Sequence, residues 1–263
     1  ASFKLPEPDC INLLQRTLDQ TENISGKSKA YLLQQVTKNT NGLSEGMQSA
    51  LFNGVLKAGT NLHDVLKGAA LQNLPRILPS MPKSERNMAA TRFLNEVNSL
   101  VSNTEQLNLL ISVVNSPILP SLNENDRFGI TTRIISKSAD FPSSDDQSWL
   151  LRNAISSIGY LPEHQQMQGI NKLFEATSNM EPSVEKVEVL CEIIGTMDTP
   201  FLLPNVDRVP LLHRVIELSS NLAPSENKIA ILDALDDFAL NTLKDQDQLE
   251  ATNAIRTARN NLL

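Results

Sequence analysis

Prolines recur at a regular spacing along most of the chain, and this spacing constrains the fold more than any other feature. Pro120, Pro142, Pro162, Pro182, Pro204 and Pro224 are separated by 20 or 22 residues, so alternate members lie 40 to 42 residues apart. A polar or acidic stretch follows, then residues with apolar positions three and four apart. Proline and acids suit the free N–H groups of a helix's first turn. Each segment of about 20 residues is therefore predicted to be one helix, and two helices make one repeat.

Two columns of residues align the repeats without gaps inside the helices. In the first helix of each pair, called the A helix, the recurring residue is basic: Arg16, Arg92, Arg133, Lys172, Arg214 and Arg256. In the second, the B helix, it is a leucine: Leu33, Leu110, Leu151, Leu190 and Leu232. The double gap between Arg16 and Arg92 predicts a degenerate second repeat with Asn53 in the basic position.

Stacked helix pairs of this length predict an all-α fold, a right-handed α-solenoid of HEAT/armadillo-like helix pairs. One pair cannot bury its apolar face alone, so neighbours must stack. The low aromatic content of 4% also favours helices over a sandwich or barrel. We expect one domain over 1–263, with a terminal helix that either caps the stack or marks where a longer array was cut. The expected repeats are approximately 5–42, 43–77, 78–117, 118–159, 160–201 and 202–241, followed by the helix 244–263.

Charge and composition exclude several classes of protein. The net charge of −7 argues against nucleic-acid binding, which requires Lys and Arg to neutralise phosphates. Cys10 and Cys191 give neither a disulfide framework nor a zinc-binding spacing. No run of eighteen apolar residues predicts a transmembrane helix. The opening "ASFKLPEPDC" lacks the basic start and apolar block of a cleavable signal peptide.

The basic column points away from the apolar positions of the A helices, so we expect a basic ladder on their solvent side. The ladder could be a multivalent site for an acidic partner or an anionic membrane. Alternatively, its members form ion pairs within their helices, because Asp19 lies three residues after Arg16 and Glu96 four after Arg92.

The B helices are the more favoured partner-binding surface, because solenoids commonly bind through one helix of each repeat. The outward column lies two residues before the leucine column: Tyr31, Asn108, Trp149, Glu188 and Ala230. Trp149 is the only tryptophan, and Trp and Tyr are favoured interface anchors. The candidate partner-binding residues are therefore Tyr31, Asn108, Trp149, Asn153, Glu188 and Glu192. Trp149 could instead pack on to the next repeat as a core residue.

Acidic residues crowd the last two B helices. They are Glu185, Glu188 and Glu192, followed by Asp233, Asp236 and Asp237. A basic peptide could dock there, or the acids could simply form a solvated face.

No catalytic constellation is present in the sequence. His63, His164 and His213 fall in unrelated positions of the repeat, and neither cysteine has a histidine nearby in sequence. The phosphate-binding, nucleophile-elbow and zinc-protease motifs are missing. We therefore expect no catalytic residues, no metal site and no cofactor.

The repeats resemble those of the Skwp-type effectors, type III secreted proteins of plant-pathogenic bacteria described as HEAT/armadillo-related. The likeness lies in "LPSMPKSERNMAATRFL", "LPSLNENDRFGITTRII", "LPEHQQMQGINKLFEA" and "LPNVDRVPLLHRVIEL", and extends over nearly the whole chain, although the second repeat departs from the pattern. The resemblance implies a protein that is secreted into the host-cell cytoplasm and binds host proteins. It transfers no catalytic residues.

The sequence thus predicts a non-catalytic protein–protein interaction scaffold. Two alternatives stay open. The chain could be the recruitment arm of a larger enzyme whose catalytic domain lies elsewhere, or a module that binds anionic membranes through the basic ladder.

Overall fold

The computed structural model describes residues 6–38, 40, 42–198, 208–222 and 226–260. These residues form helices joined by short turns, with no β-strand among them, which confirms the all-α prediction. The chain divides into two compact units, Ala1–Asn123 and Glu124–Leu263, here called unit 1 and unit 2. That the repeats form one domain stays a prediction.

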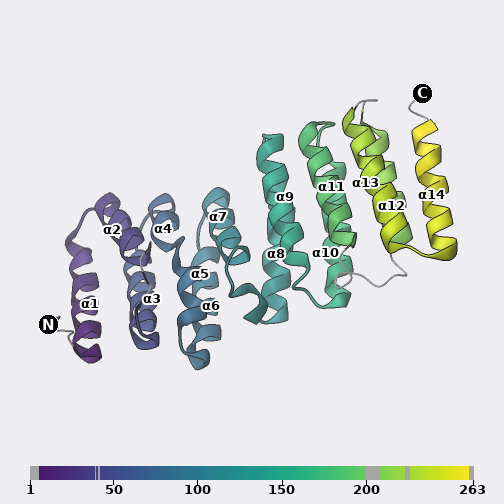
Figure 1. Ribbon diagram of the computed structural model, residues 1–263. Coiled ribbons are helices and arrows are strands. Elements are labelled where there is room, and N and C mark those ends of the chain that lie inside the picture. The colour runs from purple at the N-terminus through teal and green to yellow at the C-terminus, as the bar shows by residue number, and fades with distance from the viewer. Residues whose placement is uncertain (1–5, 39, 41, 199–207, 223–225, 261–263) are drawn as a thin grey trace. The chain divides into compact units, whose positions relative to one another are not determined.

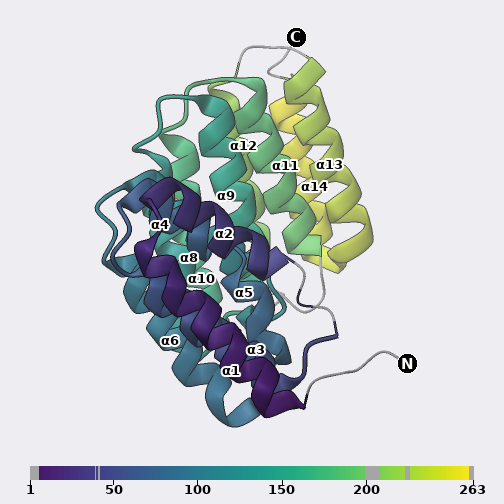
Figure 2. The same ribbon diagram turned by 90° about the vertical axis from the view of Figure 1, so that its left-hand side faces the viewer.

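In unit 1 the A helices form one layer and the B helices a second (Figures 1 and 2). Within the layers α1 packs on α3, α2 on α4, and α4 on α7. The helices are α1 (Glu7–Gln20), α2 (Gly26–Lys38), α3 (Glu45–Gly59), α4 (Asp64–Leu71), α5 (Leu74–Ile77), α6 (Lys83–Asn98) and α7 (Asn103–Val114), with 3₁₀ turns at Thr21–Asn23, Leu78–Ser80 and Leu119–Ser121.

Unit 2 repeats this pattern with longer B helices. The A helices α8, α10 and α12 pack in sequence, the B helices α9, α11 and α13 pack beside them, and α14 contacts both α12 and α13. Their bounds are α8 (Glu124–Ser138), α9 (Ser144–Ile158), α10 (Glu163–Ser178), α11 (Val184–Asp198), α12 (Arg208–Ser220), α13 (Glu226–Thr242) and α14 (Asp245–Asn260).

The second repeat departs from a simple helix pair. Its B segment is divided into α4 and the short α5, and Pro75 lies in the first turn of α5. Proline has no N–H and cannot continue the hydrogen bonding of α4, so the helix ends before it. Other repeats support the break, because the buried Asn73 side chain donates to Thr37 and Ser116 donates to the Pro75 carbonyl.

The Leu-Pro pairs do not all play the expected role at helix starts. Pro6 and Pro162 directly precede α1 and α10, as predicted. In the third and fourth repeats, however, Leu-Pro opens a 3₁₀ turn, Leu78–Ser80 or Leu119–Ser121, and the α-helix begins several residues later. Both leucines, Leu78 and Leu119, are buried, so the extra turn adds apolar surface to the core.

Burial confirms that the leucine column and the A-helix position after the basic column belong to the core. All five members of the leucine column are buried. The A-helix residues that follow the basic column, Phe93, Ile134, Leu173 and Val215, are buried as well. The apolar helix faces predicted from the periodicity of the sequence are therefore the faces that are buried between helices.

The first two A helices approach closely because α3 carries small residues opposite α1. A Cβ atom added at Gly54 would lie 2.4 Å from Cδ1 of Leu18, and one at Gly46 would lie 3.0 Å from Oε1 of Glu7. Leu18 is the buried side chain of α1. Leu18 can occupy this position because residue 54 is a glycine, which has no Cβ atom.

Six of the helices contact the preceding loop through a long polar side chain from their first turns. Such a side chain donates a hydrogen bond to a backbone carbonyl five or six residues earlier, at an apolar residue of the loop. The pairs are Gln48 with Leu43, Arg86 with Met81, Gln106 with Leu100, Gln147 with Phe141, Gln166 with Leu161, and Lys186 with Met180. We call these six donors the loop clamps. Loop carbonyls lack a partner in regular secondary structure, and a buried carbonyl without one costs about 1–3 kcal/mol.

In the B helices the loop clamps occupy one sequence position. It lies four residues before the leucine of the core, or before Leu71 in the second repeat, and holds Lys29, Lys67, Gln106, Gln147, Lys186 and Lys228. Lys186 is the most buried of them, and its Nζ donates to the Met180 carbonyl at 3.0 Å and the Ser178 carbonyl at 3.4 Å. Burial lowers the pKa of Lys186, and the charge of Glu181 opposes that shift.

Lys67 uses the same position to join two repeats. Its Nζ lies 2.5 Å from Glu96 Oε2 and 2.9 Å from the Ser99 hydroxyl, both at the end of α6. The neighbouring Asp64 accepts hydrogen bonds from the backbone N–H groups of Ser102 (2.8 Å) and Val101 (2.7 Å) before α7. The Ser102 N–H, followed by that of Val101, holds the pKa of Asp64 below its ordinary value although partial desolvation raises it.

Replacing Lys186 with methionine should lower the free energy of unfolding by about 1–3 kcal/mol, because the loop carbonyls lose their buried donor. Lys186→Gln should cost much less, since glutamine makes this contact at positions 106 and 147. Urea denaturation of both variants measures the difference. Equal stabilities of the two variants would show that the hydrogen bond at this position is unimportant.

Replacing Asp64 with asparagine should lower the unfolding temperature at neutral pH, because a neutral amide accepts the two N–H groups less strongly. The pKa of Asp64 in the folded state lies below the ordinary aspartate value of 3.8, so this stabilisation is present above that pH and is lost as the pH falls through the folded pKa. The gap between wild type and Asp64→Asn should therefore close in acid. Melting curves from pH 7 to pH 3 test this, with Asp247→Asn in the first turn of α14 as the control.

Candidate functional site

The outward column of the B helices is exposed at every one of its five members. Tyr31 exposes 66% of its surface and Trp149 exposes 49%. Trp149 is therefore not a buried core residue, and the alternative that it packs wholly on to the next repeat is wrong. Both aromatic side chains are available for contact with a partner.

Four of the six candidate partner-binding residues lie on two adjacent helices of unit 2. Trp149 and Asn153 belong to α9, and Glu188 and Glu192 belong to α11, which packs beside it. The Asn153 amide donates to the Trp149 carbonyl at 2.7 Å, and Arg152 bridges the two helices through its ion pair with Glu188 at 3.2 Å. The remaining two, Tyr31 on α2 and Asn108 on α7, lie in unit 1 with α4 between their helices.

The acids of α13 are partly neutralised from within the unit. Arg259 of α14 lies 2.6 Å from Asp233 Oδ1 and 2.5 Å from Asp236 Oδ2. Asp237, one residue further, is exposed. The acidic surface predicted for the last B helices therefore combines internally paired carboxylates with outward ones.

The basic ladder reaches the surface, but several of its members bind asparagine side chains. Arg92 donates to Asn53 Oδ1 and Arg214 to Asn171 Oδ1, each at 2.9 Å and each on the preceding A helix. Arg256 donates to Asn253 on its own helix at 2.9 Å. The guanidinium carbon of Arg214 also lies 4.9 Å from the centre of the Phe174 ring. Arg16 and Lys172 are exposed, and Arg133 and Arg214 are half-buried.

Two of the acids expected to pair with the ladder pair elsewhere. Asp19 forms its ion pair with Lys57 of α3 at 3.8 Å, and Glu96 forms one with the buried Lys67. These pairs join neighbouring helices, unlike the intrahelical pairs that the sequence spacing indicated. Two members of the ladder, Arg92 and Arg214, thus bond one A helix to the preceding one.

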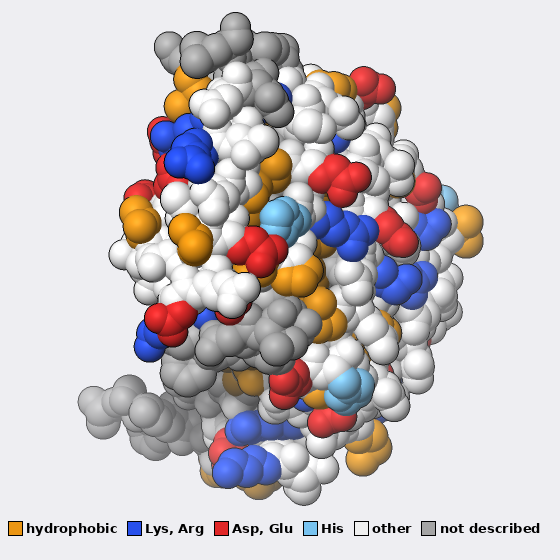
Figure 3. All heavy atoms as spheres, turned by 90° about the vertical axis from the view of Figure 1, so that its right-hand side faces the viewer, with side chains coloured by type: hydrophobic (Ala, Val, Ile, Leu, Met, Phe, Trp, Pro, Cys, Tyr) orange, Lys and Arg blue, Asp and Glu red, His pale blue; other side chains and the backbone are white. Residues whose placement is uncertain are grey.

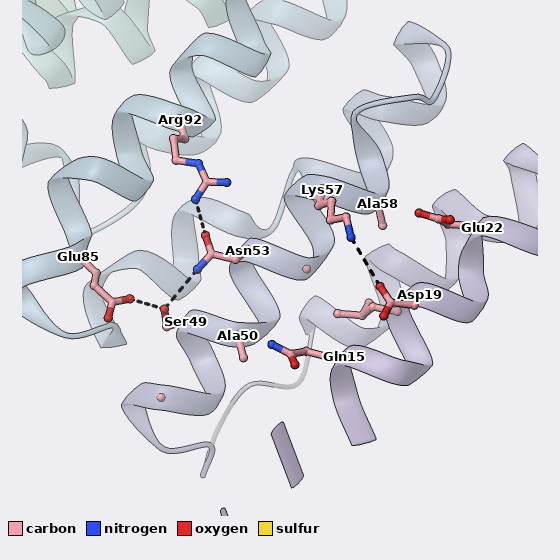
Figure 4. Close-up of a pocket in the computed structure, with 13 residues that line it drawn as sticks. Gln15, Asp19, Glu22, Ser49, Ala50, Asn53, Lys57, Ala58, Glu85 and Arg92 are labelled. Atoms are coloured by element: carbon pink, nitrogen blue, oxygen red, sulfur yellow. Dashed lines mark hydrogen bonds and ion pairs between the residues drawn. The ribbon is translucent and has the colours of Figure 1, made fainter. Parts of the chain in front are cut away.

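Unit 1 contains a groove of about 740 Å³ between α1, α3 and α6. Figure 4 shows a polar chain along it: Arg92 donates to Asn53, Asn53 donates to Ser49 at 3.4 Å, and Ser49 donates to Glu85. On the other wall, Lys57 pairs with Asp19, and Gln15 points toward Ala50. Lys57 and Asp19 are thus paired with each other, and Arg92 and Glu85 are bound by neutral side chains of α3, which indicates a mainly structural role for these residues.

Smaller hollows occur in unit 2, also beside its A helices. One of about 480 Å³ lies between α12 and α14, where His213 Nε2 is 3.2 Å from Glu250 Oε1. Another of about 170 Å³ lies between α8 and α10. Figure 3 faces the side that carries α14, where acidic, basic and a few hydrophobic side chains are interspersed. None of these hollows collects charge of one sign.

The groups that could support catalysis are dispersed. His63 and His164 are exposed on different units, and His213 pairs with Glu250. Burial, followed by the charge of Glu188, raises the pKa of the Cys191 thiol, which disfavours the nucleophilic thiolate. In the described part of the chain, no three His, Cys, Asp or Glu side chains are placed to hold a metal ion.

The sequence analysis missed the loop clamps and the asparagine partners of the ladder. The clamps of the B helices had a readable signal, because Lys or Gln recurs four residues before every leucine of the column and before Leu71. In the A helices, Cys10 occupies the position that holds the clamps Arg86 and Gln166 in later repeats. Asn53 and Asn171 gave no such signal, since their partners lie 39 and 43 residues away.

No protein-family model matches the chain, and no curated protein or solved structure matches it. Across the described residues, no helix has the length and apolar character required to cross a bilayer.

Replacing Arg214 with alanine should lower the free energy of unfolding by about 1 kcal/mol, because both its hydrogen bond to Asn171 and its contact with Phe174 are lost. Arg256→Ala is the matched control, since Arg256 donates within its own helix and should cost less than half as much. Chemical denaturation measures both. Equal losses would contradict a role for Arg214 in joining α10 and α12.

Proposed function

We propose that the chain is a non-catalytic protein-binding scaffold that contacts its partner through the outward face of the B helices. The observation that carries this proposal is the exposure of Trp149, the single tryptophan, in the outward column of a B helix. Tyr31 occupies the same column and is also exposed. Trp and Tyr bury much area with few torsions, so they commonly anchor interfaces.

The repeated helix pairs support this proposal. We take them to form a right-handed solenoid of HEAT/armadillo type, in which equivalent helices present equivalent positions to a partner. The outward column is such a position, and it is exposed in both units. One partner could therefore contact several B helices at once.

The distribution of reactive groups supports a role without catalysis. The three histidines lie on different helices or loops, and the pKa of Cys191 is raised. Of the grooves described, the largest is lined by side chains that pair with one another across it. A solenoid of this kind acts by presenting surface.

The proposal includes a biological setting that rests on the sequence resemblance to Skwp-type effectors. In that setting the chain is a secreted bacterial effector, or part of one, and its partners are proteins of the host-cell cytoplasm. The alternatives of a recruitment arm for a separate catalytic domain and of a membrane-binding ladder have no comparable observation in their favour. Arg92 and Arg214, two members of that ladder, hold neighbouring helices together.

Trp149→Ala should reduce capture of a specific partner from host extract while the fold stays intact, because a half-exposed side chain contributes little to folding. Tyr160→Ala is the control: Tyr160 is 48% exposed, like Trp149, but lies outside the outward column. Quantitative mass spectrometry of captured proteins, with circular dichroism of each variant, measures the effect. Equal loss of the partner in both variants would contradict the proposal.

A further inference from the structure

Charge is divided unequally between the two units. Residues 124–263 carry 21 acidic and 12 basic side chains, a net charge of −9. Residues 1–123 carry 9 acidic and 11 basic side chains, a net charge of +2. The net negative charge of the protein therefore belongs to unit 2.

Within unit 2, eight acids whose side chains the structure describes lie on the three B helices α9, α11 and α13. They are Asp145, Asp146, Glu185, Glu188, Glu192, Asp233, Asp236 and Asp237. Arg152 pairs with Glu188, and Arg259 pairs with Asp233 and Asp236. The basic residues of these helices include Lys186 and Lys228, which are buried. Lys186 binds the loop carbonyl of Met180, and Lys228 binds the carbonyl of Ser220 at the end of α12. The basic side chains of these three helices therefore already bind groups within unit 2.

Several carboxylates remain directed to solvent. Asp146, Glu192 and Asp237 are exposed, and among the described residues no Lys, Arg or His lies within 4 Å of their carboxylates. They lie on α9, α11 and α13 in turn, and these helices pack side by side. The carboxylates thus extend across all three B helices of the unit.

Trp149 lies within this arrangement. Asp145 and Asp146 precede it by four and three residues, so they are its neighbours on the surface of α9. On the adjacent helix α11, Glu188 is held toward α9 by Arg152, three residues after Trp149. An exposed indole with two carboxylates one turn before it on the same helix is suited to a cation, because its ring face attracts positive charge and the acids add to that attraction.

We propose that the face formed by Asp146, Trp149, Glu188, Glu192 and Asp237 binds a Lys/Arg-rich segment of a partner protein, with one cationic side chain over the Trp149 ring. The inference rests on the proposed function, since it specifies the chemistry of the partner at the same surface. Charge complementarity selects this occupant: phosphate-rich nucleic acid and anionic lipid would be repelled by the same carboxylates.

The test uses the full chain and a synthetic twelve-residue peptide in which Lys and Arg alternate with Ser. The reference peptide carries Glu at every Lys and Arg position. The single tryptophan provides an intrinsic signal, so basic-peptide binding should change its fluorescence and weaken as ionic strength rises. The acidic peptide should leave the fluorescence unchanged.

Variants locate the binding surface, with affinities measured by anisotropy of a labelled basic peptide. Trp149→Ala should weaken binding roughly two- to fivefold, as expected for an exposed cation–π contact. The double variant Asp146→Asn, Glu192→Gln should have an effect of similar size through lost ion pairs. The matched control is Glu124→Gln, Glu175→Gln, which removes two exposed carboxylates from the A helices α8 and α10 of the same unit.

Equal weakening by the control and the face variant would overturn the proposal, because attraction would then depend on net charge alone. Equal binding of the acidic peptide would overturn it too. The two proposals can be distinguished by their outcomes. If Trp149→Ala abolishes capture of a host partner but leaves basic-peptide affinity unchanged, the scaffold proposal stands and the inference about the partner's charge is wrong.

Discussion

A hydrogen bond between a long polar side chain and a loop carbonyl underlies the regularity of this structure. Each repeat must turn the chain sharply between helices, and those turns place carbonyl groups against an apolar core without a partner from secondary structure. The loop clamps supply one from the next helix, and in the B helices they do so from a single side-chain position. The turn and the start of the helix are thereby fixed together, so neighbouring pairs can stack in the same way.

The polar side chains of the A helices and of the B helices have different roles. The A helices use their polar side chains mostly on one another, as Arg92 with Asn53 and Arg214 with Asn171 show. The B helices bury their clamps and leucines and leave an aromatic and acidic outward side. Hydrogen bonds between A helices thus help to hold the stack, while side chains of the B helices such as Trp149 and Asp237 are exposed to solvent. Such a division suits a binding surface.

Helix positions, the core columns and the exposed outward column could all be predicted from periodicity, because each is a property of one helix and its apolar face. The outward direction of Trp149 could be predicted from its position relative to Leu151, but the sequence left open whether its ring folds back into the core. Partners between repeats could not be predicted in this way. Arg259 with two aspartates, or Lys67 with Glu96, depends on the offset between stacked helices, which no local pattern encodes. The break between α4 and α5 had a readable cause in Pro75, but the regular repeat obscured it.

The close approach of α1 to α3 has a consequence for the order in which the stack comes apart. α1 has one buried side chain, Leu18, and that side chain occupies the space left by Gly54. Leu18 and the half-buried Ile11 are its apolar contacts with α3, so less free energy opposes the separation of α1 than that of the more deeply buried helices, and its amides should be among the less protected in hydrogen exchange. Separation of α1 would uncover the small-residue side of α3 while the clamps of the later repeats stayed closed. Opening would therefore begin at α1 and need not spread to the helices that follow.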